Sequence, residues 1–99
     1  MPESPLKIFD TIVPVLLKAA ESVQELALGE GVIPKKYKYL IALALDAAHG
    51  AEKRVNGLAQ AAMKAGATKE EVGETLRIAL YVSGVGSTYT AARGLVGLF

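Results

Sequence analysis

The side chains best suited to acid–base chemistry in this sequence lie together in the segment "LDAAHG". His49 follows Asp46 by three residues, a spacing that places the two side chains on neighbouring faces of one helix. A carboxylate so placed can orient an imidazole, which then serves as a general acid or base near neutral pH. A histidine at a helix end can instead interact with the last backbone carbonyls. Asp46 and His49 are therefore candidate catalytic residues, and the structural reading of His49 stays open.

Asp46 is the only charged residue in the range 40–48. A carboxylate on such an apolar helix must be paired, hydrogen-bonded or protonated, because an isolated buried charge is very costly. Three arginines can pair with it, in the same chain or in a neighbouring one: Arg54, Arg77 and Arg93. The sequence leaves two interpretations, an ion pair that holds the fold or a subunit interface, and an acid at a ligand site.

The 99 residues contain no cysteine and one histidine. Disulfides, thiolate catalysis, thiolate zinc sites and cysteine-held iron–sulfur clusters are therefore excluded for the residues of this chain. A single His49 also rules out a histidine-rich metal site within one chain. We expect no metal and no cofactor.

The charge balance argues against a nucleic-acid partner. Eleven basic and ten acidic residues give a net charge of +1, whereas a nucleic-acid footprint needs a clustered basic face. The nearest candidate, Lys35, Lys36 and Lys38, is more typical of the solvated start of a helix. The longest uncharged run, 78–92, is shorter than the roughly 20 residues of a membrane span, and "MPESPLKIFD" lacks the pattern of a signal peptide. We expect a cytoplasmic protein.

The pattern of apolar residues is helical nearly throughout. An amphipathic helix is predicted over 5–28, with Pro14 kinking or dividing it. The sequence predicts further helices over 34–50, 51–65, from Thr68 to a break at 83–87, and from there to about Leu98. Thr68 and Glu71 form a capping-box pattern at the start of one of them. We expect one all-α domain over 1–99, a compact bundle of about five or six helices.

The composition favours self-association. Hydrophobic residues make up 52% of the chain, and the mean hydropathy is +0.33. A small domain has a large surface for its volume and cannot easily hide so many apolar side chains. We therefore expect part of the surface to be buried between copies.

The order of these elements resembles the carboxymuconolactone decarboxylase-like family, which includes the alkylhydroperoxidase D-like proteins. The resemblance covers roughly residues 33–95 and is carried by "YLIALALDAAHG" and "GLAQAAMKAGATKEEVGETLRIALYVSGVGS". It implies a helical bundle that assembles into a homo-oligomer, a trimer or a hexamer.

The residues that the peroxidase branch of this family uses are substituted here. Its glutamate falls at Tyr39, its two cysteines at Ala51 and Arg54, and its two histidines at Lys53 and Leu58. That chemistry needs a nucleophilic thiolate, a resolving thiol and a proton relay. We therefore do not expect thiol peroxidase activity from this chain.

The resemblance suggests a different use for the same place. A guanidinium at Arg54 can hold a carboxylate by two hydrogen bonds, and Tyr39 can offer a hydroxyl. One hypothesis is that a small anionic metabolite is bound, and decarboxylated or isomerised, near Tyr39, Asp46, His49 and Arg54. The alternative is a non-catalytic structural or partner-binding homo-oligomer with a degenerate site.

Overall fold

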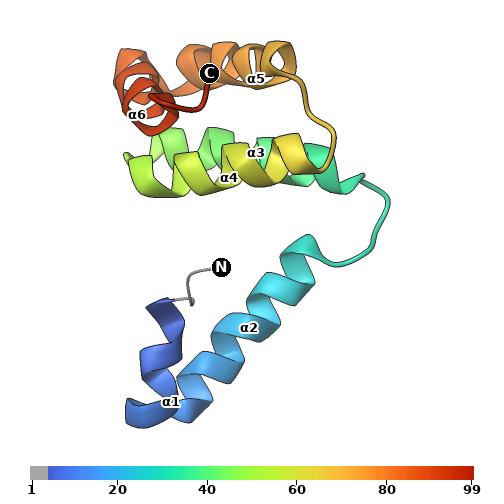
Figure 1. Cartoon of the computed structure of the whole chain (residues 1–99), viewed down its shortest axis with the longest axis vertical. Coiled ribbons are helices and arrows are strands. Elements are labelled where there is room, and N and C mark those ends of the chain that lie inside the picture. Colours follow the sequence, from blue (N-terminus) through green and yellow to red (C-terminus); the bar gives the residue numbers. More distant parts are fainter. Residues whose placement is uncertain (1–4) are drawn as a thin grey trace. The chain divides into compact units, whose positions relative to one another are not determined.

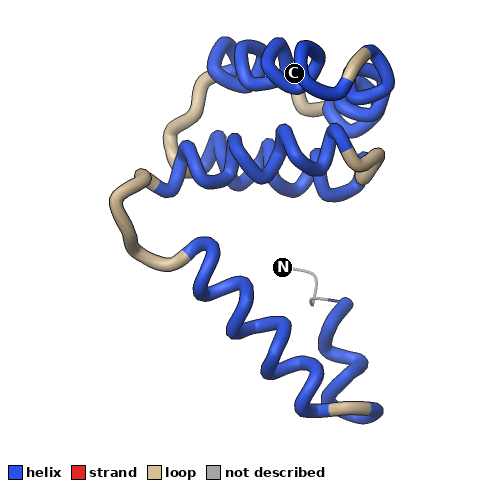
Figure 2. Tube along the Cα trace, turned by 180° about the vertical axis from the view of Figure 1, so that it is seen from behind, coloured by secondary structure: helices blue, strands red, loops and turns tan. Residues whose placement is uncertain are grey.

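The computed structural model describes residues 5–99, and every regular element among them is a helix (Figure 1 and Figure 2). These residues form six α-helices and one short 3-10 helix, so the all-α prediction is confirmed. They fall into two compact units, one ending at Gly31 and the other covering Val32–Phe99. The four residues before Pro5, the start of the MPESPLKIFD segment, lie outside the described residues.

The unit that ends at Gly31 is a bent pair of helices. The 3-10 helix η1 (Pro5–Ile8) continues into α1 (Phe9–Ile12), and α2 covers Pro14–Leu28. Val13 leaves the helical conformation at φ −146°, and Pro14 starts the next helix, where its missing N–H costs nothing. The predicted division of the helix at Pro14 is confirmed.

The predicted apolar stripe of α2 is not covered within this unit. Among the described residues of η1, α1 and α2, Leu17 alone is buried. Val15, Val23 and Leu26 are 73%, 65% and 85% exposed. The amphipathic pattern correctly predicted a helix, but the apolar side of that helix is not packed against anything in its own unit.

The second unit contains four helices in two layers. Helices α3 (Lys35–Ala48) and α4 (Glu52–Lys64) lie side by side, and α5 (Lys69–Ser83) and α6 (Val85–Leu95) cover them (Figure 1). Most predicted ends agree to within two residues. The predicted break at 83–87 is narrower, a single Gly84, and the last helix ends at Leu95, before the predicted Leu98.

The core of this unit lies between the two layers. Leu43, Val55 and Val72 are its largest fully buried side chains. Around them lie mostly alanines, which allow the helix backbones to approach closely: Ala47, Ala59, Ala62, Ala67 and Ala91. On α5, Val72 and Ala79 are buried, whereas Leu80 is 43% exposed.

Two glycines make the sharp turns of this unit. Gly50 has φ +79° between α3 and α4, and Gly84 has φ +84° between α5 and α6. Side chains other than glycine rarely adopt this left-handed region. Gly50 therefore allows α4 to return along α3, and Gly84 allows α6 to start at once after α5.

The predicted capping box at the start of α5 is present. The backbone N–H of Glu71 donates to Thr68 Oγ1 over 3.1 Å, and the backbone N–H of Thr68 donates to Glu71 Oε1 over 2.9 Å. Glu71 Oε2 also lies 3.1 Å from Lys36 Nζ, which ties the start of α5 to the start of α3. The Thr68 N–H and, after it, the Lys36 ammonium lower the pKa of Glu71 from its ordinary 4.5.

Helices α4 and α6 meet at Gly94 with no room for a side chain. A Cβ at this position would lie 2.6 Å from the carbonyl oxygen of Glu52 and 2.8 Å from Val55 Cγ1. Asn56 Nδ2 donates to the Gly94 carbonyl over 2.8 Å, and Arg93 Nε pairs with Glu52 Oε2 over 2.7 Å. The start of α4 is therefore fixed against α6 by backbone contact.

We expect Gly94→Ala to destabilise the protein, because the added methyl group must push apart two helix backbones. The expected loss in the free energy of unfolding is about 1–3 kcal/mol, measured by urea denaturation. Gly57→Ala is the matched control, since Gly57 is on α4 and its Cβ would meet nothing within 4 Å. That variant should gain about 0.5–1 kcal/mol from helix propensity. Equal stability of the two variants would contradict the close approach.

The pH dependence of stability should reveal the Glu71 contacts. A pKa lowered on folding contributes stability above pH 4.5 that is lost as the pH falls through the folded-state pKa. Wild type should therefore melt at a higher temperature than Glu71→Gln at pH 7, and the difference should shrink below pH 4.5. Glu70→Gln is the control, because Glu70 is exposed in the same first turn of α5 and no hydrogen bond or ion pair is recorded for it among residues 5–99. A difference that is the same at pH 3 and pH 7 would exclude this role.

Candidate functional site

The turn between α3 and α4 brings two of the four candidate residues together. Asp46, in the last turn of α3, accepts a hydrogen bond of 2.9 Å from Arg54 Nε in the first turn of α4. The backbone N–H of Ala51 donates to the Asp46 carbonyl over 2.9 Å and closes the turn. Of the three arginines that the sequence offered to Asp46, the structure selects Arg54. We call this corner, residues 46–54, the α3–α4 corner.

The two side chains of this ion pair differ in their exposure to solvent. The Asp46 side chain is 15% exposed, and the Arg54 side chain is 71% exposed. Only Nε of the guanidinium has a recorded partner among the described residues, so the two Nη atoms are open to solvent. A carboxylate oxygen pair fits two guanidinium N–H groups side by side. Asp46 thus holds the guanidinium while its outer edge is left for an anion.

His49 occupies the same corner without a recorded contact to Asp46. It is the residue that ends α3, at φ −87° and ψ 0°, and its backbone N–H donates to the Leu45 carbonyl. Its side chain is exposed, and no side-chain hydrogen bond is recorded for it within residues 5–99. The imidazole can therefore exchange protons with solvent or with a ligand at the corner.

Tyr39 lies apart from this group. It is two helical turns before Asp46 on α3, half-buried, and packed against the hydrophobic core. Two other substituted positions are also packed. Leu58 contacts the core, and Ala51, which precedes α4, is half-buried. Lys53 is exposed. The structure joins Asp46 and Arg54, keeps His49 at their corner, and places Tyr39 at the edge of the core.

A groove between α3 and α5 is the feature that the sequence analysis missed. Its volume is about 600 Å³, and it contains none of the four candidate residues. Most of the side chains that line it are apolar: Leu40, Ile41, Ala44, Leu45, Ala48, Ile78 and Val82. The sequence feature that could have indicated this groove is the apolar character of α3 on most of its sides. An apolar helix is usually buried, whereas Ile41 and Leu45 are 50% and 56% exposed.

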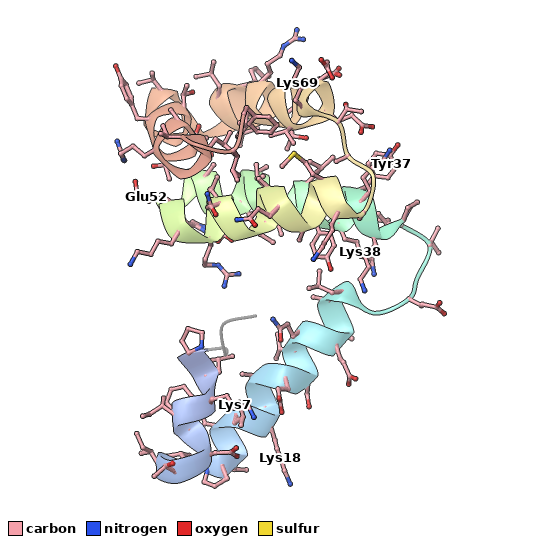
Figure 3. The ribbon with its side chains drawn as sticks, viewed as in Figure 1. Lys7, Lys18, Tyr37, Lys38, Glu52 and Lys69 are labelled. Atoms are coloured by element: carbon pink, nitrogen blue, oxygen red, sulfur yellow. The ribbon has the colours of Figure 1, made fainter. Side chains whose placement is uncertain are left out.

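The two ends of the groove differ in polarity. At the end where α3 and α5 begin, Tyr37, Glu71 and Glu74 line it, and Lys36 Nζ lies 4.8 Å from the centre of the Tyr37 ring. Figure 3 shows Tyr37 and Lys69 at this same end of the unit, while Lys38 points from the opposite side of α3. At the other end, Val82 and Ser83 line the groove. We call this feature the α3–α5 groove.

Within residues 5–99 no group of three or more histidine, cysteine, aspartate or glutamate side chains is placed to hold a metal ion. None of the helices described is long and apolar enough to cross a membrane.

Comparison with known proteins supports the resemblance noted in the sequence. Searches of curated proteins and of solved structures found no match. A comparison with protein families matches the carboxymuconolactone decarboxylase family over residues 14–96. The match starts at Pro14 and so includes α2, which the predicted range of 33–95 did not. It covers most of the 99 residues, and the chain therefore belongs to the carboxymuconolactone decarboxylase family.

Proposed function

We propose that this family member binds a small anionic metabolite at the α3–α4 corner and works without thiol chemistry of its own. The observation that supports this most directly is the Arg54 guanidinium, which Asp46 holds through Nε while its outer nitrogens stay open. An oriented guanidinium loses less freedom on binding a carboxylate than a mobile one, so its hydrogen bonds contribute more to affinity.

The catalytic form of the proposal assigns a role to each candidate residue. Arg54 binds the carboxylate of the substrate, and Asp46 is its positioning residue. In a decarboxylation, the bond to the carboxylate carbon breaks, CO₂ leaves, and the electron pair stays on an unsaturated lactone. His49 then delivers a proton to that carbon skeleton as a general acid. In an isomerisation, His49 removes a proton from one carbon of the substrate and returns it to another, while Tyr39 supports α3 by packing against the core.

The proposal also includes the setting of this chemistry. The chain is taken as one cytoplasmic domain that forms a homo-oligomer, a trimer or a hexamer. The hydrophobic content of 52% and the uncovered apolar side chains of α2 and α3 support association.

A non-catalytic homo-oligomer with a degenerate site is the second candidate. Two observations favour it. Ala51 is half-buried and Leu58 is packed against the core, so these substituted positions are filled with ordinary side chains. Arg54 is 71% exposed and lines no part of the α3–α5 groove. In this case the corner is a surface ion pair, and the protein acts through assembly or partner binding.

Arg54→Ala should weaken binding of small carboxylates by at least tenfold, because the guanidinium that Asp46 holds is removed. Isothermal titration with unsaturated lactone acids and keto acids measures the effect. Lys53→Ala is the matched control, since Lys53 is exposed on the same turn and has no recorded partner among the described residues. A loss that is equal in both variants would assign binding to general charge and not to Arg54.

A measurement of substrate turnover distinguishes the catalytic function from the non-catalytic one. Release of CO₂ from an unsaturated lactone acid should be measurable in wild type, lost in Arg54→Ala and strongly reduced in His49→Gln. Asp46→Asn should lower activity less, because the amide can still accept from Arg54 Nε. If no lactone or keto acid is turned over and none raises the melting temperature, the catalytic proposal fails and the oligomeric candidate is left.

A further inference from the structure

Two apolar surfaces of this chain are not covered within their own unit, and each belongs to a different unit. One is the exposed side of α2, formed by Val15, Leu16, Ala19, Val23 and Leu26, which we call the α2 stripe. The other is the α3–α5 groove, where Ile78 and Val82 are 62% and 73% exposed. A convex helix face and a concave groove are the two halves of a helix-in-groove contact.

The two surfaces match in length. The α2 stripe extends from Val15 to Leu26, and the groove extends along α3 from Tyr37 to Ala48. Each covers the same number of helical residues, and at a rise of about 1.5 Å per residue each is roughly 16 Å long. The stripe can therefore fill the groove along its whole length.

The charged residues beside the two surfaces favour one direction of α2 relative to α3. Lys18 borders the N-terminal part of the α2 stripe, and Glu25 borders its C-terminal part. The groove is lined by carboxylates only where α3 and α5 begin: Glu71, which is already paired with Lys36, and Glu74, for which no ion pair is recorded among the described residues. If α2 lies parallel to α3, Lys18 meets Glu74, whereas the opposite direction brings Glu25 to these carboxylates.

We propose that the α2 stripe of a second copy of this chain packs into the α3–α5 groove, parallel to α3. The inference rests on the self-association included in the proposed function, and it names the surfaces that produce it. The contact joins two copies, and each of its surfaces is defined by the side chains of one unit alone.

Disulfide trapping tests this contact directly, because the chain contains no cysteine of its own. In the parallel arrangement Val23 lies near Ile78. Val23→Cys and Ile78→Cys, prepared as separate full-length variants, should form a linked dimer when they are mixed and oxidised. Val96→Cys is the matched control partner, since Val96 is 79% exposed and belongs to neither surface. The proposal would be overturned if Val23→Cys gave no more linked dimer with Ile78→Cys than with Val96→Cys. It would also be overturned if the Val23–Ile78 disulfide formed only within a chain that carries both cysteines.

Light scattering, which measures the particle mass, gives a second and independent test of this contact. Val23→Asp and Ile78→Asp should each lower the particle mass toward 10.4 kDa, with unchanged helical content because both side chains are exposed. Val32→Asp, at a position that is 100% exposed and in neither surface, should leave the mass unchanged. Lys18→Glu and Glu74→Lys should each raise the dissociation constant about two- to fivefold, and the double variant should recover the wild-type value.

The outcomes distinguish the contact from the association on which it rests. A wild-type particle of 10.4 kDa would overturn both. A larger particle that does not trap the Val23–Ile78 link, and that Ile78→Asp leaves intact, would overturn this contact alone. Neither result depends on ligand binding or CO₂ release, so the function of the α3–α4 corner is tested separately.

Discussion

The close approach of α4 to α6 at Gly94 is the constraint on which the second unit depends. The position of Gly94 against the Glu52 carbonyl fixes the start of α4. Arg54 is in the same first turn, so its reach to Asp46 is set by this backbone contact and not by the ion pair alone. An exposed ion pair contributes only about 0–1 kcal/mol, too little to hold a helix in place. The packing therefore positions the pair, and the pair orients one guanidinium.

The α3–α4 corner depends on backbone features that need no particular chemistry in the side chains. The turn needs a glycine at Gly50, a helix end before it and a helix start after it, and none of these depends on a thiol. Substitution then changes what the corner presents to solvent. A thiolate offers a nucleophile, whereas Arg54 offers a permanent cation with open hydrogen-bond donors. The corner therefore presents a cation and no sulfur nucleophile.

The sequence predicted what depends on neighbours along the chain. Pro14 divides the first helix, Gly50 and Gly84 make turns, and the Thr68–Glu71 box starts α5, because each acts within a few residues. The sequence did not select Arg54 over Arg77 and Arg93 as the partner of Asp46. That choice depends on how α3 and α4 pack, which periodicity does not encode.

The apolar surfaces were hard to assign for the same reason. Periodicity shows that a helix has an apolar side, but it does not show whether that side faces a core or an opening. Leu80 is an apolar residue of α5 that is 43% exposed. The apolar residues of α3 likewise include some that line the open α3–α5 groove and some that are buried in the core. Which apolar faces are covered is decided by contacts distant in sequence, including any contact with another copy.

Leu40 belongs both to the hydrophobic core and to the wall of the α3–α5 groove. A single side chain thus separates the interior of this unit from whatever covers the groove. An occupant that binds only the folded unit must stabilise it by mass action, and its loss must loosen the core from that side. If the proposed second copy is this occupant, the folding equilibrium of the chain is coupled to its own concentration, and dilution lowers its stability.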